Sequence, residues 1–232
     1  MNYFESRPLS ILGFFAIPLL IFLFWMGHYL PSIAVNGYQN LIIAFEFIFT
    51  QKEVTIIFGL LNANLIEAID MGNKIDFGFM LVYSGFFFLL FRRLRKFHQF
   101  EYAVVGQALA ILMLLADTIE NFQLLHITSL FPDSNNLDIE NTISILQIAT
   151  WTKWLSIAAA LSLAGSALWE NYGLAAKILS LLLSLPIVLS ARALVNLDAS
   201  SIELFTASIF GAIGLLVLSC YFLKPVVLKL KI

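Results

Sequence analysis

Six stretches of this 232-residue chain are long and apolar enough to cross a lipid bilayer as helices. A helix rises about 1.5 Å per residue, so about 20 apolar residues cross the roughly 30 Å hydrocarbon core of a membrane. The stretches cover residues 9–30, 75–91, 102–127, 143–169, 174–194 and 202–223. They predict an all-α, polytopic transmembrane helix bundle of about six spans, in which residues 1–232 form one integral membrane domain.

Charged residues are few for a chain of this length, which supports the membrane prediction. Hydrophobic residues make up 60% of the sequence and charged residues 12%, whereas a typical soluble domain has about 45–50% and about 25%. Such a chain would expose large apolar patches to water, and lipid is the solvent that tolerates them. The net charge of -2 creates no basic field, so nucleic acid is not an expected partner.

The distribution of basic residues predicts the orientation of the bundle. If the spans alternate, one side holds Arg7, Arg92, Arg93, Arg95, Lys96, Lys177, Lys224, Lys229 and Lys231. The other side holds Lys52 and Lys74 among several acids, followed by Asp133, Asp138 and Glu140. The positive-inside rule places the basic side, with both termini, in the cytoplasm. The sequence has no Asn-x-Ser/Thr glycosylation site, which favours a bacterial source, so we expect a multi-pass protein of the bacterial inner membrane.

The connection 32–74 between the first two spans faces outward and is too apolar for a solvated loop. Its apolar runs, 41–50 and 54–69, are each too short for a full span, and Glu46 interrupts the first. We therefore expect one or two helices that lie in the membrane interface or enter the membrane as a re-entrant hairpin. Two thin additional spans are the alternative, and they would leave the orientation unchanged.

Ionisable residues occur inside three of the predicted spans, where an unpaired charge is costly. The third span carries Asp117, Glu120 and Asn121, whose offsets of three and four place them on one helical face. The fourth span carries Lys153, and the fifth carries Arg192 near its outer end. We expect these side chains to face the bundle interior and to pair with one another.

Heights above the cytoplasmic edge indicate which of these groups can meet. At 1.5 Å per residue, Glu120 and Arg192 both lie roughly 27 Å up, Asp117 roughly 22 Å and Lys153 roughly 15 Å. A polar cluster is therefore predicted in the outer half of the bundle. Its candidate ligand-binding residues are Asp117, Glu120, Asn121, Lys153 and Arg192, with Gln123 and Glu203 near its mouth. Asp76 could join from above, but a helix N-cap is the simpler interpretation.

No metal or other cofactor is expected. Cys220 is the single cysteine, and His28, His98 and His126 are too scattered to place two ligands on one helical face. The sequence also lacks the G-x-S-x-G, H-E-x-x-H and Walker A motifs. The motifs therefore assign no enzyme class.

Three functional hypotheses remain open. The preferred one is a non-enzymatic protein that binds or transports a small polar ligand, or a lipid head group, through the polar cluster. The second is a structural or accessory subunit of a membrane complex, whose ion pairs only fix helix packing. The third is an intramembrane lipid-modifying enzyme, with Asp117 or Glu120 as general acid or base and Arg192 or Lys153 binding a phosphate. The expected partners are accordingly the lipid bilayer, a small ligand and other membrane subunits.

Overall fold

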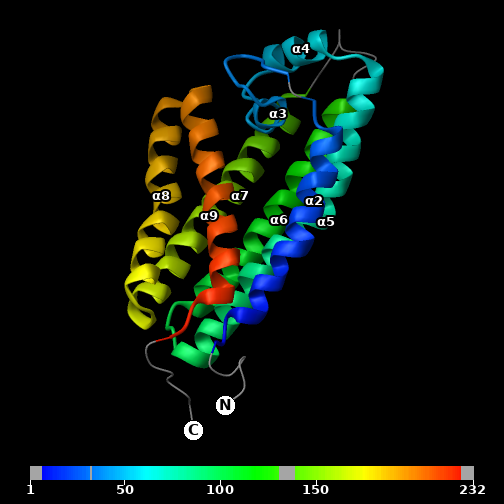
Figure 1. Cartoon of the computed structure of the whole chain (residues 1–232). Coiled ribbons are helices and arrows are strands. Elements are labelled where there is room, and N and C mark those ends of the chain that lie inside the picture. Colours follow the sequence, from blue (N-terminus) through cyan, green and yellow to red (C-terminus); the bar gives the residue numbers. More distant parts are fainter. Residues whose placement is uncertain (1–6, 32, 131–138, 226–232) are drawn as a thin grey trace.

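Long helices packed side by side form the body of the protein, and two short helices lie across one end (Figure 1). The computed structural model describes residues 7–31, 33–130 and 139–225. The body consists of a 3-10 segment, η1 (Ser10–Phe15), and the helices α2 (Ala16–Tyr29), α5 (Ala63–His98), α6 (Ala103–Ser129), α7 (Glu140–Asn171), α8 (Leu174–Asn196) and α9 (Ala199–Phe222). The two short helices are α3 (Leu41–Glu46) and α4 (Gln51–Leu60). Of the residues used to predict the orientation, Asp133, Asp138, Lys229 and Lys231 lie outside the described ranges.

The helices of the body fit a membrane protein. Five segments of the described chain are long and apolar enough to cross a membrane: Ser10–Tyr29, Ala63–His98, Ala103–Ser129, Leu174–Asn196 and Ala199–Phe222. Large apolar side chains such as Phe24, Leu115 and Val188 are exposed on their outer faces, as lipid contact requires. The predicted all-α polytopic bundle is thus confirmed.

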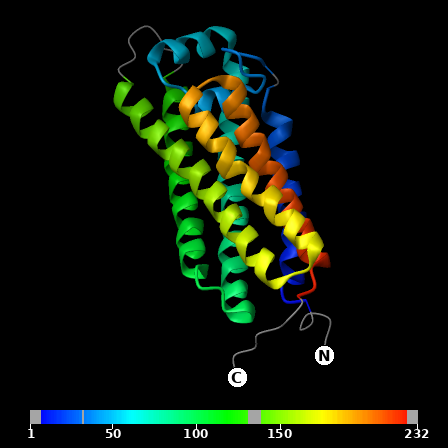
Figure 2. The same ribbon diagram turned by 90° about the vertical axis from the view of Figure 1, so that its left-hand side faces the viewer.

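The sixth predicted span corresponds to α7, which is 32 residues long but less apolar than the other five. It packs between α6 and α8 and runs along the length of the bundle (Figures 1 and 2). Its polar residues include Gln147, Thr150 and Lys153, and the contacts of these side chains are described below. The count of six spans remains a prediction.

Helix α5 begins earlier than the sequence predicted. Its 36 residues extend about 54 Å, well beyond the roughly 30 Å hydrocarbon core. Residues 63–74, which we assigned to the connection, form the first three turns of this helix, and the Asn62 side chain caps it by accepting a hydrogen bond from the Leu65 amide at 3.0 Å. Hydropathy did not join these turns to the second span, because polar residues such as Glu67 and Lys74 interrupt them. A helix can nevertheless continue outside lipid.

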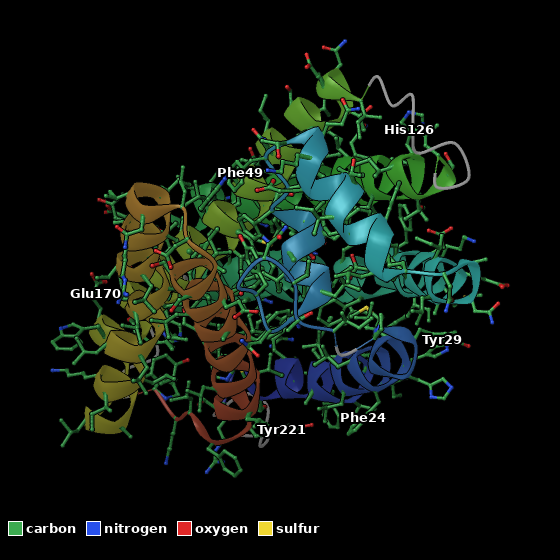
Figure 3. All side chains as sticks on the ribbon, turned by 90° about the horizontal axis from the view of Figure 1, so that it is seen from above. Phe24, Tyr29, Phe49, His126, Glu170 and Tyr221 are labelled. Carbon is green, nitrogen blue, oxygen red and sulfur yellow. The ribbon has the colours of Figure 1, made fainter. Side chains whose placement is uncertain are left out.

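Helices α3 and α4, together with the loop 33–40, form a cap over one end of the bundle, which we call the cap end; Figure 3 shows the cap from above. A reciprocal capping box starts α4: Thr50 Oγ1 accepts from the Glu53 amide, and Glu53 Oε2 accepts from the Thr50 amide. Each helix of the cap is too short to cross a membrane, as the sequence predicted for this segment.

The opposite end, which we call the terminal end, brings both ends of the described chain together. Arg7 Nη1 donates to the Tyr221 carbonyl at 3.3 Å, and Arg93 donates to the Pro8 carbonyl. Tyr172 forms an isolated β-bridge with Pro225, and its hydroxyl lies 2.9 Å from His98 Nε2. The basic residues near these contacts therefore share one end of the bundle, as predicted.

The half of the bundle next to the terminal end has a dense apolar interior. Its apolar core includes Phe87, Leu90 and Phe91 of α5 and Leu161 and Leu168 of α7, and all five are fully buried. Small residues allow the helices to approach one another. A Cβ added to Gly106 of α6 would lie 2.3 Å from the Phe91 ring, and one added to Gly165 of α7 would lie 3.0 Å from the Ser180 carbonyl oxygen of α8.

Candidate functional site

A buried charge cluster lies in the other half of the bundle, toward the cap end, and Lys153 of α7 is at its centre. The Lys153 ammonium donates to Glu120 of α6, and it lies 3.2 Å from Glu46 Oε2 and 3.4 Å from Asp117 Oδ1. Lys153 is 5% exposed, Asp117 2% and Glu120 1%. Three carboxylates thus surround one ammonium group in an environment that excludes water.

The ion pairs also attach the cap to the bundle, through one face of α7. Glu46 Oε2 accepts from Trp154 Nε1 at 3.0 Å, and the Glu46 carbonyl accepts from Thr150 Oγ1 at 3.2 Å. One turn before Thr150 in α7, Gln147 Nε2 donates to two carbonyls of the loop 47–50, at 3.2 Å each. These α7 residues recur at spacings of three and four, so one helical face holds the end of α3.

Glu46 is the acid of the cluster that comes from the cap. Burial raises the pKa of its carboxyl above the ordinary value, because removal from water disfavours the charged form. The Lys153 ammonium acts in the opposite direction, as do the hydrogen bonds from Trp154 and Lys153.

Polar pairs between α5 and α6 extend the cluster. The Tyr83 hydroxyl donates to Asp117 Oδ2, and Asn121 Nδ2 donates to Asp76 Oδ2 at 2.7 Å. Closer to the cap, Thr128 Oγ1 donates to Asp70 Oδ1 at 2.6 Å. The pairs follow one another in antiparallel order, so they fix the register of α5 against α6. Asp76 belongs to none of the described ion pairs.

A cavity of about 220 Å³ adjoins these groups. Its polar wall contains Asn40 and Glu46 of the cap, and it continues along the bundle with Asn73, Asp76, Asp117, Asn121 and Lys153. Its other walls are apolar and aromatic, and they are lined by Leu23, Met26, Leu30, Ile43, Phe79, Tyr83, Trp154, Ile157, Ile209, Phe210 and Ile213. This volume lies below the roughly 300–1,000 Å³ of sites that enclose a drug-sized molecule, so it suits a head group or a small molecule.

The cavity reaches the outer surface between α2 and α9. Leu23 of α2 and Phe210 of α9 both line it, yet they are 38% and 42% exposed. Near the terminal end, α9 packs on η1, whereas α2 and α9 make little contact with each other (Figure 1). Since the exposed faces of these helices are apolar, this opening faces the region that lipid occupies.

One donor on the polar wall has no partner in the described part of the chain. Asn73 Nδ2 is buried without a hydrogen bond, in a residue that is 3% exposed and lines the cavity one turn before Asp76. Leaving such a group unsatisfied costs free energy. A ligand or water in the cavity is placed to satisfy it.

The structure brings together four of the five predicted site residues. Asp117, Glu120 and Lys153 form the ion-pair cluster, and Asn121 joins it through Asp76. Of the two residues expected near the mouth, Glu203 holds the cap by accepting from the Gln39 and Asn40 amides at 2.7 and 2.8 Å, whereas Gln123 is absent from the described cavity lining.

Arg192 is the fifth residue, and its predicted pairing with Glu120 is wrong. It lies exposed near the end of α8, where its Nε donates to Ser201 Oγ at 3.2 Å. Helix α8 packs on α7 and α9 but contributes no described residue to the cavity. The calculated heights of Glu120 and Arg192 agree, but height does not reveal that α7 separates α8 from α6.

Sequence reasoning missed two acids of the site. Glu46 appeared only as an interruption of an apolar run, although a lone acid in such a run is itself the signal of a buried partner. Asp76 was considered as a further member of the cluster, but the helix N-cap interpretation was preferred. That interpretation is wrong, because α5 begins thirteen residues earlier, at Ala63, and Asp76 lies inside it. A search for ionisable residues within every apolar segment would have included Glu46, and Asp76 already lay at the start of the predicted span 75–91.

The chemistry of the cavity is acidic. All the ion-pair partners described for Lys153 are carboxylates, and the lining contains no other basic residue in the described chain. Carboxylates beside Lys153 repel a phosphate, so this lining disfavours phosphate binding, and Arg192 is absent from the described lining. Comparison with protein-family models, curated proteins and solved structures gave no match to this chain.

Proposed function

We propose that this protein is a non-enzymatic membrane protein that binds, or transports, a small ligand with a polar head through the cavity beside Lys153. The observation that carries the proposal is the position of the cavity, between a charge cluster and an opening that faces lipid. Ionisable residues are costly inside a membrane bundle, and they commonly mark a ligand site or pathway. The binding roles of Asp117, Glu120, Asn121 and Lys153 belong to this proposal.

The shape of the cavity supports a ligand with two chemically different parts. A polar head would lie against Asp76 and Asn73, and an apolar part would lie against Leu23 and Phe210 at the opening. Such a molecule would enter sideways from the membrane, because the cap lies across this end of the bundle (Figure 3) and contributes Asn40, Ile43 and Glu46 to the cavity lining. Lipids and single-chain amphiphiles have this division.

The proposal includes an orientation and a location. Arg7, Arg93 and Lys177 lie at or near the terminal end, and the positive-inside rule assigns that end to the cytoplasm. The cap and cavity would then be in the outer half of a bacterial inner membrane. The test is a cysteine introduced at exposed Lys52 of the cap and a membrane-impermeant thiol reagent applied to intact cells. Labelling of this cysteine is expected, and its protection would show that the orientation is the opposite one.

Filling the opening tests the cavity itself. Gly27 lines it, and a Cβ added there meets nothing within 4 Å, so the backbone position accepts a side chain and Gly27→Leu places an apolar group at the opening. Gly214 is also exposed on a wall helix with nothing within 4 Å, but it does not line the cavity, so Gly214→Leu is the matched control.

Trp154 is a suitable reporter because it lines the cavity. Replacing Trp25, Trp151 and Trp169 by Phe leaves it as the single tryptophan. Chain-brominated dodecanol and dodecylamine, added to this protein in nanodiscs of zwitterionic lipid, should quench its fluorescence in a saturable manner. Gly27→Leu should reduce the affinity for the probes by about tenfold, and Gly214→Leu should leave it unchanged.

The alternative function is a structural subunit whose ion pairs only attach the cap. The contacts of Glu46 with Trp154 and Lys153 favour this hypothesis, because they stabilise the fold without any ligand. Under it, quenching of Trp154 would not saturate, and Gly27→Leu would behave like Gly214→Leu. That result would overturn the proposed binding function.

A further inference from the structure

Acidic groups outnumber basic groups in the region of the cavity. Lys153 is the basic residue of the cluster, and the acids beside it are Glu46, Asp76, Asp117 and Glu120. If all were ionised, the cluster would hold three excess negative charges in a region that excludes water, which is too costly to persist. The excess must therefore be neutralised by protons or by a bound cation.

Asp76 is the acid best placed to receive a cation. Glu120 accepts from Lys153 and does not line the cavity. Glu46 does line it, but its carboxylate accepts from both Lys153 and Trp154. Asp117 accepts from Tyr83 and faces the same ammonium. Asp76 accepts only from the neutral Asn121 amide among the described hydrogen bonds, and it lines the cavity. The Asp76 carboxylate is thus accessible from the cavity, and no basic side chain among its described contacts balances its charge.

The surroundings of Asp76 favour an organic ammonium group over a metal ion. In the described part of the chain, no three acidic, His or Cys side chains converge closely enough to hold a metal. The cavity is instead lined by the aromatic rings of Phe79, Tyr83, Trp154 and Phe210, and such rings attract ammonium groups through their π faces. Asn73 Nδ2 supplies a donor for an acceptor atom next to that group.

We infer that the ligand is an amphiphile whose head carries an ammonium group, bound by the Asp76 carboxylate beside Asn73 and the aromatic wall. This inference rests on the proposed function, since it names the class of ligand for the same cavity. The apolar chain extends between Leu23 and Phe210 toward lipid. When the cavity lacks this ligand, protons neutralise the acids that the ammonium would otherwise balance.

Three probes with the same alkyl chain isolate the charge of the head. With the Trp154 reporter protein in zwitterionic nanodiscs at neutral pH, brominated dodecylamine should bind at least about tenfold more tightly than brominated dodecanol, because hydrogen bonds to charged groups are stronger than neutral ones. Brominated dodecyl sulfate should bind weakest. Equal affinity for amine and alcohol, or a preference for the sulfate, would overturn the inference while leaving the proposed cavity binding intact.

Substitutions then assign the charge to Asp76. Asp76→Asn should remove the preference for the amine and leave dodecanol affinity within about twofold, and Asp76→Glu should retain part of the preference. Glu67→Gln is the matched control, because it removes an exposed acid from the same helix. If Asp76→Asn retains the full preference, Asp76 is not the ammonium-binding group and the inference fails.

Competition with ethylamine distinguishes a membrane-borne amphiphile from a small amine dissolved in water. Ethylamine has the same head without the chain, so it should displace brominated dodecylamine only at far higher concentration. Displacement at similar concentrations would show that the chain is unimportant and would overturn the assignment to an amphiphile. If none of the probes quenches Trp154 saturably, the proposed function fails together with the inference.

Discussion

The two halves of the bundle use the same helices in opposite ways. Toward the terminal end, the fully buried Phe91 ring of α5 packs against Gly106 of α6, and α7 contributes fully buried Leu168 to the same apolar core. Toward the cap end, the same three helices contribute Tyr83, Glu120 and Lys153. One half is held by close apolar packing, and the other is held by ion pairs beside a cavity.

This difference separates stability from binding along a single set of helices. Apolar packing in a membrane depends on close approach, so small residues make it rigid. Buried ion pairs contribute little net stability, since desolvation offsets their attraction. The half near the terminal end is therefore expected to hold the helices together, whereas the half near the cap end is free to accommodate a ligand and a movable charge.

Replacing the central lysine should have the largest effect on this comparison. Lys153→Met leaves Glu46, Asp117 and Glu120 without their ammonium partner, and we expect it to lower the free energy of unfolding by about 3–5 kcal/mol. Thermal unfolding in detergent measures this. The loss should shrink at acidic pH and with Glu120→Gln added, because both remove negative charge. An unchanged unfolding temperature at neutral pH would show that the lysine does not hold the cluster.

A substitution in the other half should affect stability without affecting binding. Gly106→Ala places a Cβ 2.3 Å from the Phe91 ring, and overpacking of this kind costs about 1–3 kcal/mol. Gly85→Ala is the control on α5, where a Cβ meets nothing within 4 Å, so its effect should stay within about 1 kcal/mol. If Gly106→Ala changed probe affinity at the cavity as strongly as it changed stability, the two halves would be coupled.

Acidification should weaken amine binding. Protons and the ammonium group compete for the same acids. The titratable groups that act on Asp76 are Glu46 of α3, Tyr83 of α5, Asp117 of α6 and Lys153 of α7. If one proton must leave the acids before the amine binds, the affinity for dodecylamine falls by up to about tenfold for each unit by which the pH is lowered below the pKa of the acid. Dodecanol affinity should stay constant in the same titration, and a parallel loss for both probes would indicate that acid alters the fold instead.

The smallest predicted effect concerns the cap. Thr50→Ala removes the side-chain half of the capping box of α4 and should cost about 1 kcal/mol. Hydrogen exchange of the α4 amides should accelerate by about fivefold. Thr55→Ala is the matched control, because Thr55 lies exposed within α4 and bonds only the Gln51 carbonyl. Exchange that accelerates equally in both variants would show that the capping box does not hold the cap.

The sequence by itself determined the helices of the bundle, because the requirement for apolar length in lipid is local. It also identified Asp117, Glu120, Asn121 and Lys153, since a charge in an apolar span must find a partner. Residues 63–74 were assigned to the connection and not to the helix of the second span. Hydropathy reports immersion in lipid, while a helix such as α5 continues beyond the membrane on backbone hydrogen bonds alone.

Only the tertiary structure decided which charges meet. Rise per residue fixes the height of a side chain but not the order of helices around the bundle, so Arg192 and Glu120 share a level and remain apart. Glu120 pairs with Lys153 instead, and the same lysine also pairs with Glu46, whose short helix belongs to the cap. Neighbours across a bundle are set by side-chain packing between distant segments, and no local pattern records that packing.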